Sequence, residues 1–153
     1  MKKLIFVTII LFASIFLAAK SEQGNFLNLH PQPTATIKGQ AFTLLVAKTL
    51  DEKQTGLTKL QTLPTNQGMY FPFDKPDYVA FWMKNMKFPI DMIFINKNKI
   101  VDIKQNAQPA DPKDNNPTIY TPQAPANAVL EINANLSKKY GFQNGDTVVI
   151  SGL

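Results

Sequence analysis

The sequence predicts a mostly β fold: a single-domain β-sandwich or barrel with two short helices. Three observations support this class. Short apolar runs rich in β-branched and aromatic residues alternate with turn-forming residues. Only two short segments carry the signals of a helix start and stop. The chain has 153 residues, a length typical of one domain, and shows no internal repeat.

The N-terminal segment is predicted to direct export. Residues 1–19 combine a basic start at Lys2 and Lys3 with an apolar run and a small residue, Ala19, which is the layout of a secretory signal peptide. Leu17 stands where cleavage prefers a small side chain, so an uncleaved anchor is the alternative. We therefore expect a periplasmic or extracellular protein, with contact to a membrane only through this segment.

Residues 20–36 read as a linker, and residues 37–153 as the mostly β domain. The linker is rich in Asn, Gln, Pro and Thr and has no periodic apolar pattern. It contains the only histidine, His30, and the chain has no cysteine. Disulfides and thiolate sites are therefore excluded, and a histidine-based metal site or catalytic triad in the domain is not expected. We predict no metal and no cofactor.

The first half of the domain begins with a strand at 41–49. A short helix follows, with Thr49 as its N-cap and Gly56 as its stop. Apolar runs at 68–73 and 78–84 predict two further strands.

The second half is organised around a β-hairpin with a two-residue turn at 97–98, where Asn tolerates positive φ. This turn predicts that Ile95 faces Ile100 and that Ile93 faces Asp102.

The remaining segments follow in order. A proline-rich loop occupies 107–125 and includes an edge strand at 118–121. A strand at 126–134 precedes one helical turn capped by Asn135, and a last strand closes the chain.

The charge pattern opposes nucleic-acid binding. All 16 basic residues are Lys, and residues 21–153 contain 13 of them against 11 acidic residues. The absence of Arg removes the bidentate forks that suit phosphate and guanine.

A set of motifs resembles a known family. These motifs are "GL" at 56–57, "GMYFPF" at 68–73, "FWMKNMKFPIDMIFI" at 81–95, "VLEI" at 129–132 and "GDTV" at 145–148. In this order they are similar to the bacterial and archaeal family called domain of unknown function 192. The resemblance implies a small, mostly β sandwich or jelly-roll-like domain, often exported, with no established activity. Two positions depart from the pattern of the family: Gln54 stands where a basic residue is usual, and Thr58 where methionine is common.

The motif at 81–95 contains the first candidate ligand-binding residues. Side chains alternate along a strand, so Phe81 and Met83 in the core would direct Trp82 and Lys84 outward. A Trp beside an ammonium group can hold a sugar or another flat polar ligand. The alternative is that Trp82 belongs to the core or only covers a sheet edge, while Lys84 extends to water.

Two further polar residues of this motif, Asn85 and Asp91, are also candidates. Pro89 interrupts a continuous strand, so a bend is expected between them. Asn85 and Asp91 would satisfy the backbone N–H groups of this bend, or Asp91 would pair with Lys84. The functional alternative makes Asp91 a ligand acceptor or general base.

Glu131 is the fifth candidate. It alternates with Leu130 and Ile132, so the default expectation is an exposed side chain. If Glu131 lay near Asp91, the two carboxylates could act as an acid–base pair.

Two functions remain open. The first is an uncharacterised exported cell-envelope protein, a non-enzymatic ligand-binding or accessory module. Its polar–aromatic patch would hold an unknown small molecule, a glycan or an envelope protein. The alternative is a small hydrolase-like enzyme that uses Asp91 and Glu131 as acid and base with Lys84 stabilising charge. The sequence leaves open whether the protein is an enzyme, and the catalytic residues are unknown.

Overall fold

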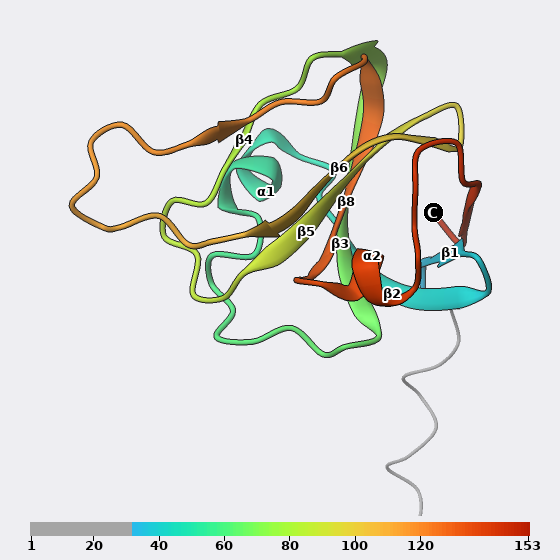
Figure 1. Ribbon diagram of the computed structural model, residues 1–153, viewed down its shortest axis with the longest axis horizontal. Helices are drawn as coiled ribbons and strands as arrows, with labels where there is room; N and C mark the ends of the chain where they lie inside the picture. Colours follow the sequence, from blue (N-terminus) through green and yellow to red (C-terminus); the bar gives the residue numbers. More distant parts are fainter. Residues whose placement is uncertain (1–31) are drawn as a thin grey trace, which may run out of the picture. The chain divides into compact units, whose positions relative to one another are not determined.

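The computed structural model describes residues 32–153, so the predicted signal peptide and most of the predicted linker lie outside the described residues. Seven strands form one sheet in the order β6-β5-β8-β3-β2-β1-β9, and β4 and β7 form a second, small sheet (Figure 1). The predicted mostly β class with two short helices is confirmed. None of the helices between residues 32 and 153 has the length and apolar character needed to cross a membrane.

The elements have the following bounds: β1 (Thr34–Ile37), β2 (Gln40–Val46), α1 (Leu50–Thr55), β3 (Gln67–Asp77), β4 (Phe81–Trp82), β5 (Ile90–Asn96), β6 (Lys99–Ala107), β7 (Ile119–Tyr120), β8 (Ala126–Asn133), α2 (Leu136–Lys139) and β9 (Val148–Ser151). Strand β1 starts three residues before the predicted domain boundary at residue 37, because its apolar residues pair with both β2 and β9.

The large sheet curls until its two end strands meet. An isolated antiparallel bridge joins Lys99, at the start of β6, to Thr147, just before β9. The N–H of Ile100 donates to the Asp146 carbonyl at 3.0 Å, and the N–H of Val148 donates to the Asn98 carbonyl at 2.9 Å. The sheet is therefore closer to the barrel than to the sandwich of the sequence prediction.

The predicted hairpin joins β5 to β6. Lys97 and Asn98 both have positive φ, +47° and +61°, as a tight two-residue turn requires. The predicted pairing of Ile95 with Ile100 is confirmed.

The second predicted pair of this hairpin, Ile93 with Asp102, is wrong. Asp102 pairs with Phe94, and Ile93 pairs with Ile103, because the register shifts between Phe94 and Ile95. Such an irregularity places an extra residue on one strand, and no turn signal in the sequence reveals it.

Both faces of the sheet are covered by apolar side chains. On β5, Ile93 and Ile95 belong to one buried cluster, while Met92 and Phe94 belong to the other. A strand covered on both sides reads as a continuous apolar run, which explains the composition of β5.

The predicted core is largely confirmed. Five of its seven members are fully buried: Met83, Met92, Phe94, Leu130 and Ile132. The other two, Phe81 and Val101, are partly buried against the second cluster.

The strand predicted at 78–84 is shorter than expected. Only Phe81 and Trp82 form strand pairs, with Tyr120 and Ile119 of β7 respectively.

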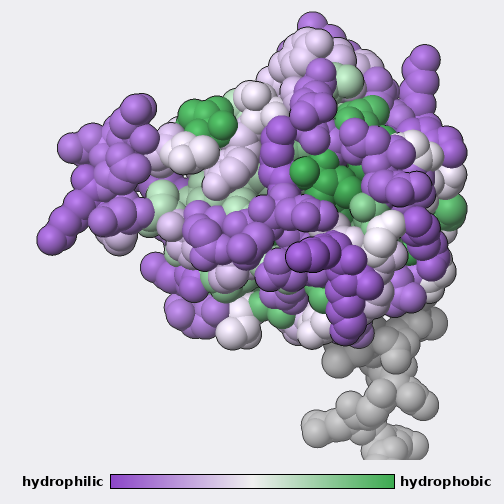
Figure 2. Space-filling view, viewed as in Figure 1, coloured by the Kyte–Doolittle hydropathy of each residue, from purple (hydrophilic) through white to green (hydrophobic). Residues whose placement is uncertain are grey.

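The proline-rich loop between β6 and β7 extends away from the sheet (Figure 1). Residues 111–116 are exposed, and Figure 2 shows this projecting region as hydrophilic. Its carboxylates bond the backbone of the loop itself: Asp111 accepts from the N–H of Lys113, and Asp114 from the N–H of Asn116, both at 2.8 Å. Solvation of a polar loop accounts for this segment.

Candidate functional site

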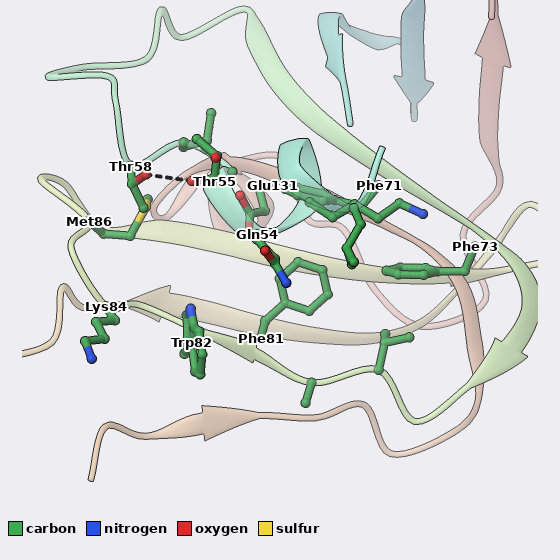
Figure 3. A pocket seen from close by; sticks show the side chains of 16 residues that line it. Gln54, Thr55, Thr58, Phe71, Phe73, Phe81, Trp82, Lys84, Met86 and Glu131 are labelled. Carbon is green, nitrogen blue, oxygen red and sulfur yellow. Dashed lines mark hydrogen bonds between the residues drawn. The ribbon is translucent and has the colours of Figure 1, made fainter. Parts of the chain in front are cut away.

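A pocket of about 310 Å³ lies beside the second core cluster (Figure 3). Its wall combines α1 and the turn that follows it with side chains from β3, the β4 segment and β8. The lining residues are Leu50, Lys53, Gln54, Thr55, Gly56, Leu57, Thr58, Phe71, Phe73, Val79, Ala80, Phe81, Trp82, Lys84, Met86 and Glu131. The volume is within the range of small-molecule sites.

Helix α1 forms one wall and is held by a complete capping box. The Thr49 hydroxyl accepts from the N–H of Glu52 at 3.2 Å, and the Glu52 carboxylate accepts from the N–H of Thr49 at 2.7 Å. This backbone hydrogen bond from Thr49 is the main cause that lowers the pKa of Glu52. The helix ends at Gly56, whose positive φ of +49° suits glycine. The sequence prediction for this helix is confirmed at both ends.

Aromatic rings form the opposite wall. The rings of Phe71 and Phe81 pack edge-to-face with their centroids 5.2 Å apart, and Phe73 meets Phe81 in the same way at 6.4 Å. Edge-to-face packing stabilises a pair of rings beyond the area it buries, so this wall is well supported.

Glu131 is the acidic residue of the pocket. Strand β8 lies between β3 and β5, where Glu131 pairs with Met69 on one side and Met92 on the other. The side chain is on the face of the second core cluster and only 5% exposed. Among residues 32–153, no hydrogen bond or ion pair to its carboxyl group is formed. The expectation of an exposed Glu131 is therefore wrong, because α1 and the β4 segment cover this face.

Burial has a strong effect on the ionisation of Glu131. Desolvation by burial raises the pKa of its carboxyl from 4.5 to about 8, because the charged form loses water and gains no partner. At neutral pH the carboxyl is therefore mainly protonated, and it can donate a hydrogen bond into the pocket.

Trp82 and Lys84 are exposed lining residues of the pocket, and Lys53 is a half-buried one. Trp82 is 56% exposed and Lys84 is exposed, as the alternation along β4 predicts. In Figure 3 the ammonium end of Lys84 points away from the other labelled side chains. Lys53, from α1, holds its Nζ 4.7 Å from the centre of the Phe73 ring. This is a cation–π contact on the pocket wall.

Asp91 lies away from this pocket and is completely buried. One carboxylate oxygen accepts from the N–H groups of Asn106 and Asn135 at 2.7 and 2.9 Å. The other accepts from the N–H and the hydroxyl of Ser137. Asp91 therefore connects β5 to the end of β6 and to the start of α2.

The sequence predicts that Asp91 hydrogen-bonds the backbone of the bend that precedes it. This prediction is wrong about the hydrogen-bond partners of Asp91. The carboxylate does bind backbone N–H groups, but those groups belong to segments 15 to 46 residues away. It also replaces the predicted cap of α2: Asn135 has a φ of +67° and makes no side-chain capping bond. No ion pair joins Asp91 to Lys84 in the described part of the chain.

Asn85 is exposed and does not line the pocket. Its φ of +63° marks it as the turning residue of the bend, a conformation that Asn adopts more readily than most residues. Among the described residues its side chain makes no hydrogen bond within the bend, so that part of the prediction is also wrong.

The two candidate carboxylates do not meet. Asp91 pairs across the sheet with Ile132 of the first core cluster, whereas Glu131 pairs with Met92 of the second. Neighbouring residues of a strand point to opposite faces, so the sheet separates the two carboxyl groups. The acid–base pair considered from the sequence is not formed.

Several residues of the pocket were not predicted from the sequence. They are Lys53, Gln54, Thr58, Phe71 and Phe73, contributed by α1, its following turn and β3. One signal was available: Gln54 and Thr58 are the two positions that depart from the family pattern. Within residues 32–153, no three acidic or histidine side chains gather in a group that could hold a metal ion.

A family model agrees with the resemblance seen in the motifs. The model of DUF192, described as "Uncharacterized ACR", matches residues 33–150. None of the curated proteins matches the chain.

Two solved structures are similar to this one. A protein of unknown function from Novosphingobium aromaticivorans DSM 12444 is 34% identical, with a TM-score of 0.68, over 76% of this chain and 82% of that chain. A protein from Sinorhizobium meliloti 1021, described as a "putative transcription regulator", is 29% identical, with a TM-score of 0.68, over 82% of this chain and 98% of that chain.

Proposed function

We propose that this chain, which belongs to the DUF192 family, is a non-enzymatic ligand-binding module of the cell envelope. The ligand is a small, largely apolar molecule that enters the pocket between α1, β3 and the β4 segment. It makes its main polar contact with Glu131.

The observation that carries this proposal is the state of Glu131. The side chain is only 5% exposed, lines a pocket, and has no hydrogen-bond partner for its carboxyl among residues 32–153. The carboxyl oxygens are not themselves fully enclosed, since Asn96 Oδ1 is the one enclosed polar side-chain atom without a partner in this part of the chain, so a ligand in the pocket can reach them. Burial of a polar group without a partner is costly, so such groups are rare unless something else binds them. A ligand that enters the pocket supplies the missing partner.

The surrounding side chains support a ligand with an apolar body. Most lining residues are aliphatic or aromatic, and Phe71, Phe81 and Trp82 offer ring surfaces. Small-molecule sites commonly combine such a lining with a few polar groups that orient the ligand. This refines the polar–aromatic patch expected from the sequence: Trp82, Lys84 and Glu131 belong to the binding residues, whereas Asn85 and Asp91 do not.

The hydrolase-like alternative loses its main support. It requires Asp91 and Glu131 to act on one substrate, but they lie on opposite faces of the sheet. Asp91 is fully occupied by four hydrogen bonds.

The proposed location in the cell envelope is supported by the signal-like sequence of residues 1–19.

A fragment screen by thermal shift tests the binding function, because ligands that bind the native state raise its melting temperature. A blocked variant, Ala80→Trp, fills the pocket from an exposed lining position. Lys113→Trp, in the exposed loop, is the matched control. We expect hits that stabilise the wild type and the control but not the blocked variant. Absence of hits, or equal shifts in all three proteins, would refute the proposed binding function.

Cell fractionation with an epitope-tagged chain tests the proposed location in the cell envelope. Recovery of the protein only in the cytoplasm would contradict that location.

A further inference from the structure

We infer that the ligand is an amphipathic organic acid, with an uncharged hydrogen-bond acceptor such as a carbonyl at its inner end and a carboxylate at its outer end. The inner group accepts a hydrogen bond from Glu131, and the carboxylate lies beside Lys53. This inference rests on the proposed binding function and names the chemical class that the pocket selects.

At Glu131 the pocket favours a ligand group that accepts a hydrogen bond. Glu131 is nine-tenths buried, lines the pocket and has no partner among the described residues. The pKa of its carboxyl, raised to about 8 by burial, keeps the group mainly protonated at neutral pH. A protonated carboxyl donates one hydrogen bond, and a carbonyl oxygen of the ligand is a suitable acceptor.

The lysine side chains of the lining favour a negatively charged group at the other end of the ligand. Lys53 holds its ammonium group over the Phe73 ring at 4.7 Å, which fixes a positive charge on the pocket wall. Lys84 carries a second positive charge at an exposed lining position, but its ammonium end points away from the other labelled side chains (Figure 3), so Lys53 is the main partner of the anion. A carboxylate on the ligand complements these charges, and a charge-assisted hydrogen bond to Lys53 is stronger than a neutral one.

The two ends are separated by an apolar surface. Neither lysine forms an ion pair with Glu131 in the described part of the chain, and Lys53 instead holds its Nζ over the Phe73 ring. The rings of Phe71 and Phe81 belong to the wall that also carries Phe73. The matching ligand therefore has an apolar, preferably aromatic, body between its two polar ends.

The opposite chemistry, an ammonium group bound by Glu131 and the aromatic rings, is less well matched. The titratable groups that line the pocket are Glu131, Lys53 from α1 and Lys84 after β4. The neighbours of Glu131 on β3 and β5 are Met69 and Met92 and carry no charge. With Glu131 protonated, the lining is net positive and repels a cation.

A matched set of four probes tests the inference by isothermal titration of the purified protein. 4-Acetylbenzoate has both polar ends; 4-isopropylbenzoate lacks the acceptor; 4-acetylbenzamide lacks the charge; and 4-(aminomethyl)benzoate replaces the acceptor by an ammonium group. We expect 4-acetylbenzoate to bind about 3- to 10-fold more tightly than each of the other three, which is the usual effect of one hydrogen bond or ion pair.

Single substitutions test which residue binds the carboxylate end of the probe and which binds its acceptor end. Lys53→Gln should weaken 4-acetylbenzoate several-fold and leave 4-acetylbenzamide unchanged, whereas Lys59→Gln, at an exposed residue outside the lining, should change neither. Affinity of the wild type should fall about tenfold between pH 7 and pH 9 as Glu131 loses its proton. Glu131→Gln keeps a donor that does not titrate, so its affinity should not change over this range.

Three outcomes overturn the inference while the binding function stands: tighter binding of the ammonium probe, equal binding of 4-isopropylbenzoate, or no binding of any probe when the fragment screen yields hits that Ala80→Trp abolishes. Failure of both the probes and the screen refutes the binding function itself.

Discussion

Two buried carboxyl groups lie on neighbouring strands and have opposite environments. Asp91 accepts four hydrogen bonds, three of them from backbone N–H groups. Glu131 accepts none from residues 32–153 and lines a pocket. A carboxylate surrounded by donors supports the structure, whereas a carboxyl without partners destabilises it and is available to a ligand.

The substitution Glu131→Gln should stabilise the protein in alkaline solution. The folded pKa of about 8 exceeds the unfolded value of 4.5, so the folded state holds an extra proton between these values and stability falls as pH rises through this window. The full difference amounts to roughly 3–5 kcal/mol at about 1.36 kcal/mol per pKa unit. Chemical denaturation at pH 4, 6 and 8.5 should show the advantage of the variant growing with pH. A constant difference at all three values would contradict the raised pKa.

The substitutions Asp91→Ala and Lys84→Ala should differ strongly in their effect on stability, because Asp91 has a structural role and Lys84 lies on the surface. Removal of Asp91 leaves the buried N–H of Ser137 and the partly buried N–H groups of Asn106 and Asn135 without their acceptor, and should cost about 3–5 kcal/mol of unfolding free energy. Lys84 is exposed and forms no ion pair within residues 32–153, so its removal should change stability by less than about 0.5 kcal/mol. Urea denaturation measures both, and the reverse order would disprove the assigned roles.

At the scale of elements, the close approach of β3 and β8 positions Glu131. Gly68 of β3 pairs with Ile132, and a Cβ atom at Gly68 would lie 2.8 Å from the carbonyl oxygen of Glu131 and 2.9 Å from a methyl carbon of Leu130. Only glycine allows the two strands to pack at this distance.

Gly68→Ala should therefore destabilise the domain by about 1–3 kcal/mol, since the backbone of β8 must move to relieve the contact. Gln67→Ala, at the adjacent and half-buried position, is the control and should have a smaller effect. Thermal unfolding compares the two variants. A Gly68→Ala protein with the stability of the wild type would show that the strands can separate without cost.

At the scale of the whole molecule, one sheet supports two apolar clusters, one on each face. Two of its inner strands, β5 and β8, contribute side chains to both clusters, so the clusters share one backbone. The pocket lies beside the second cluster, and the Asp91 network lies on the side of the first. Loss of packing on either face should therefore affect the whole domain.

Leu130→Ala in the first cluster and Phe94→Ala in the second test this coupling. Both side chains are completely buried, and each substitution should cost about 2–5 kcal/mol. Each variant should still unfold in a single transition, followed by both circular dichroism and tryptophan fluorescence from Trp82. Two separate transitions in either variant would mean that the two faces fold independently.

The sequence by itself determined the local features of this protein. The Thr49 cap and Gly56 stop of α1 and the turn at Lys97 and Asn98 depend on backbone preferences of a few adjacent residues. The alternation in β8 likewise established that Glu131 lies on the face opposite Leu130. These features are local, so a single sequence contains them.

Only the tertiary structure decided which faces are covered and which partners meet. Alternation separates two faces but does not reveal that α1 and the β4 segment, encoded about 50 to 80 residues earlier, bury the face of Glu131. The partners of Asp91 lie 15 to 46 residues away, and the shift in the β5–β6 register moves Asp102 from Ile93 to Phe94. Burial and hydrogen bonding of a side chain depend on which distant segments pack over it, and that packing is set by the curl of the entire sheet.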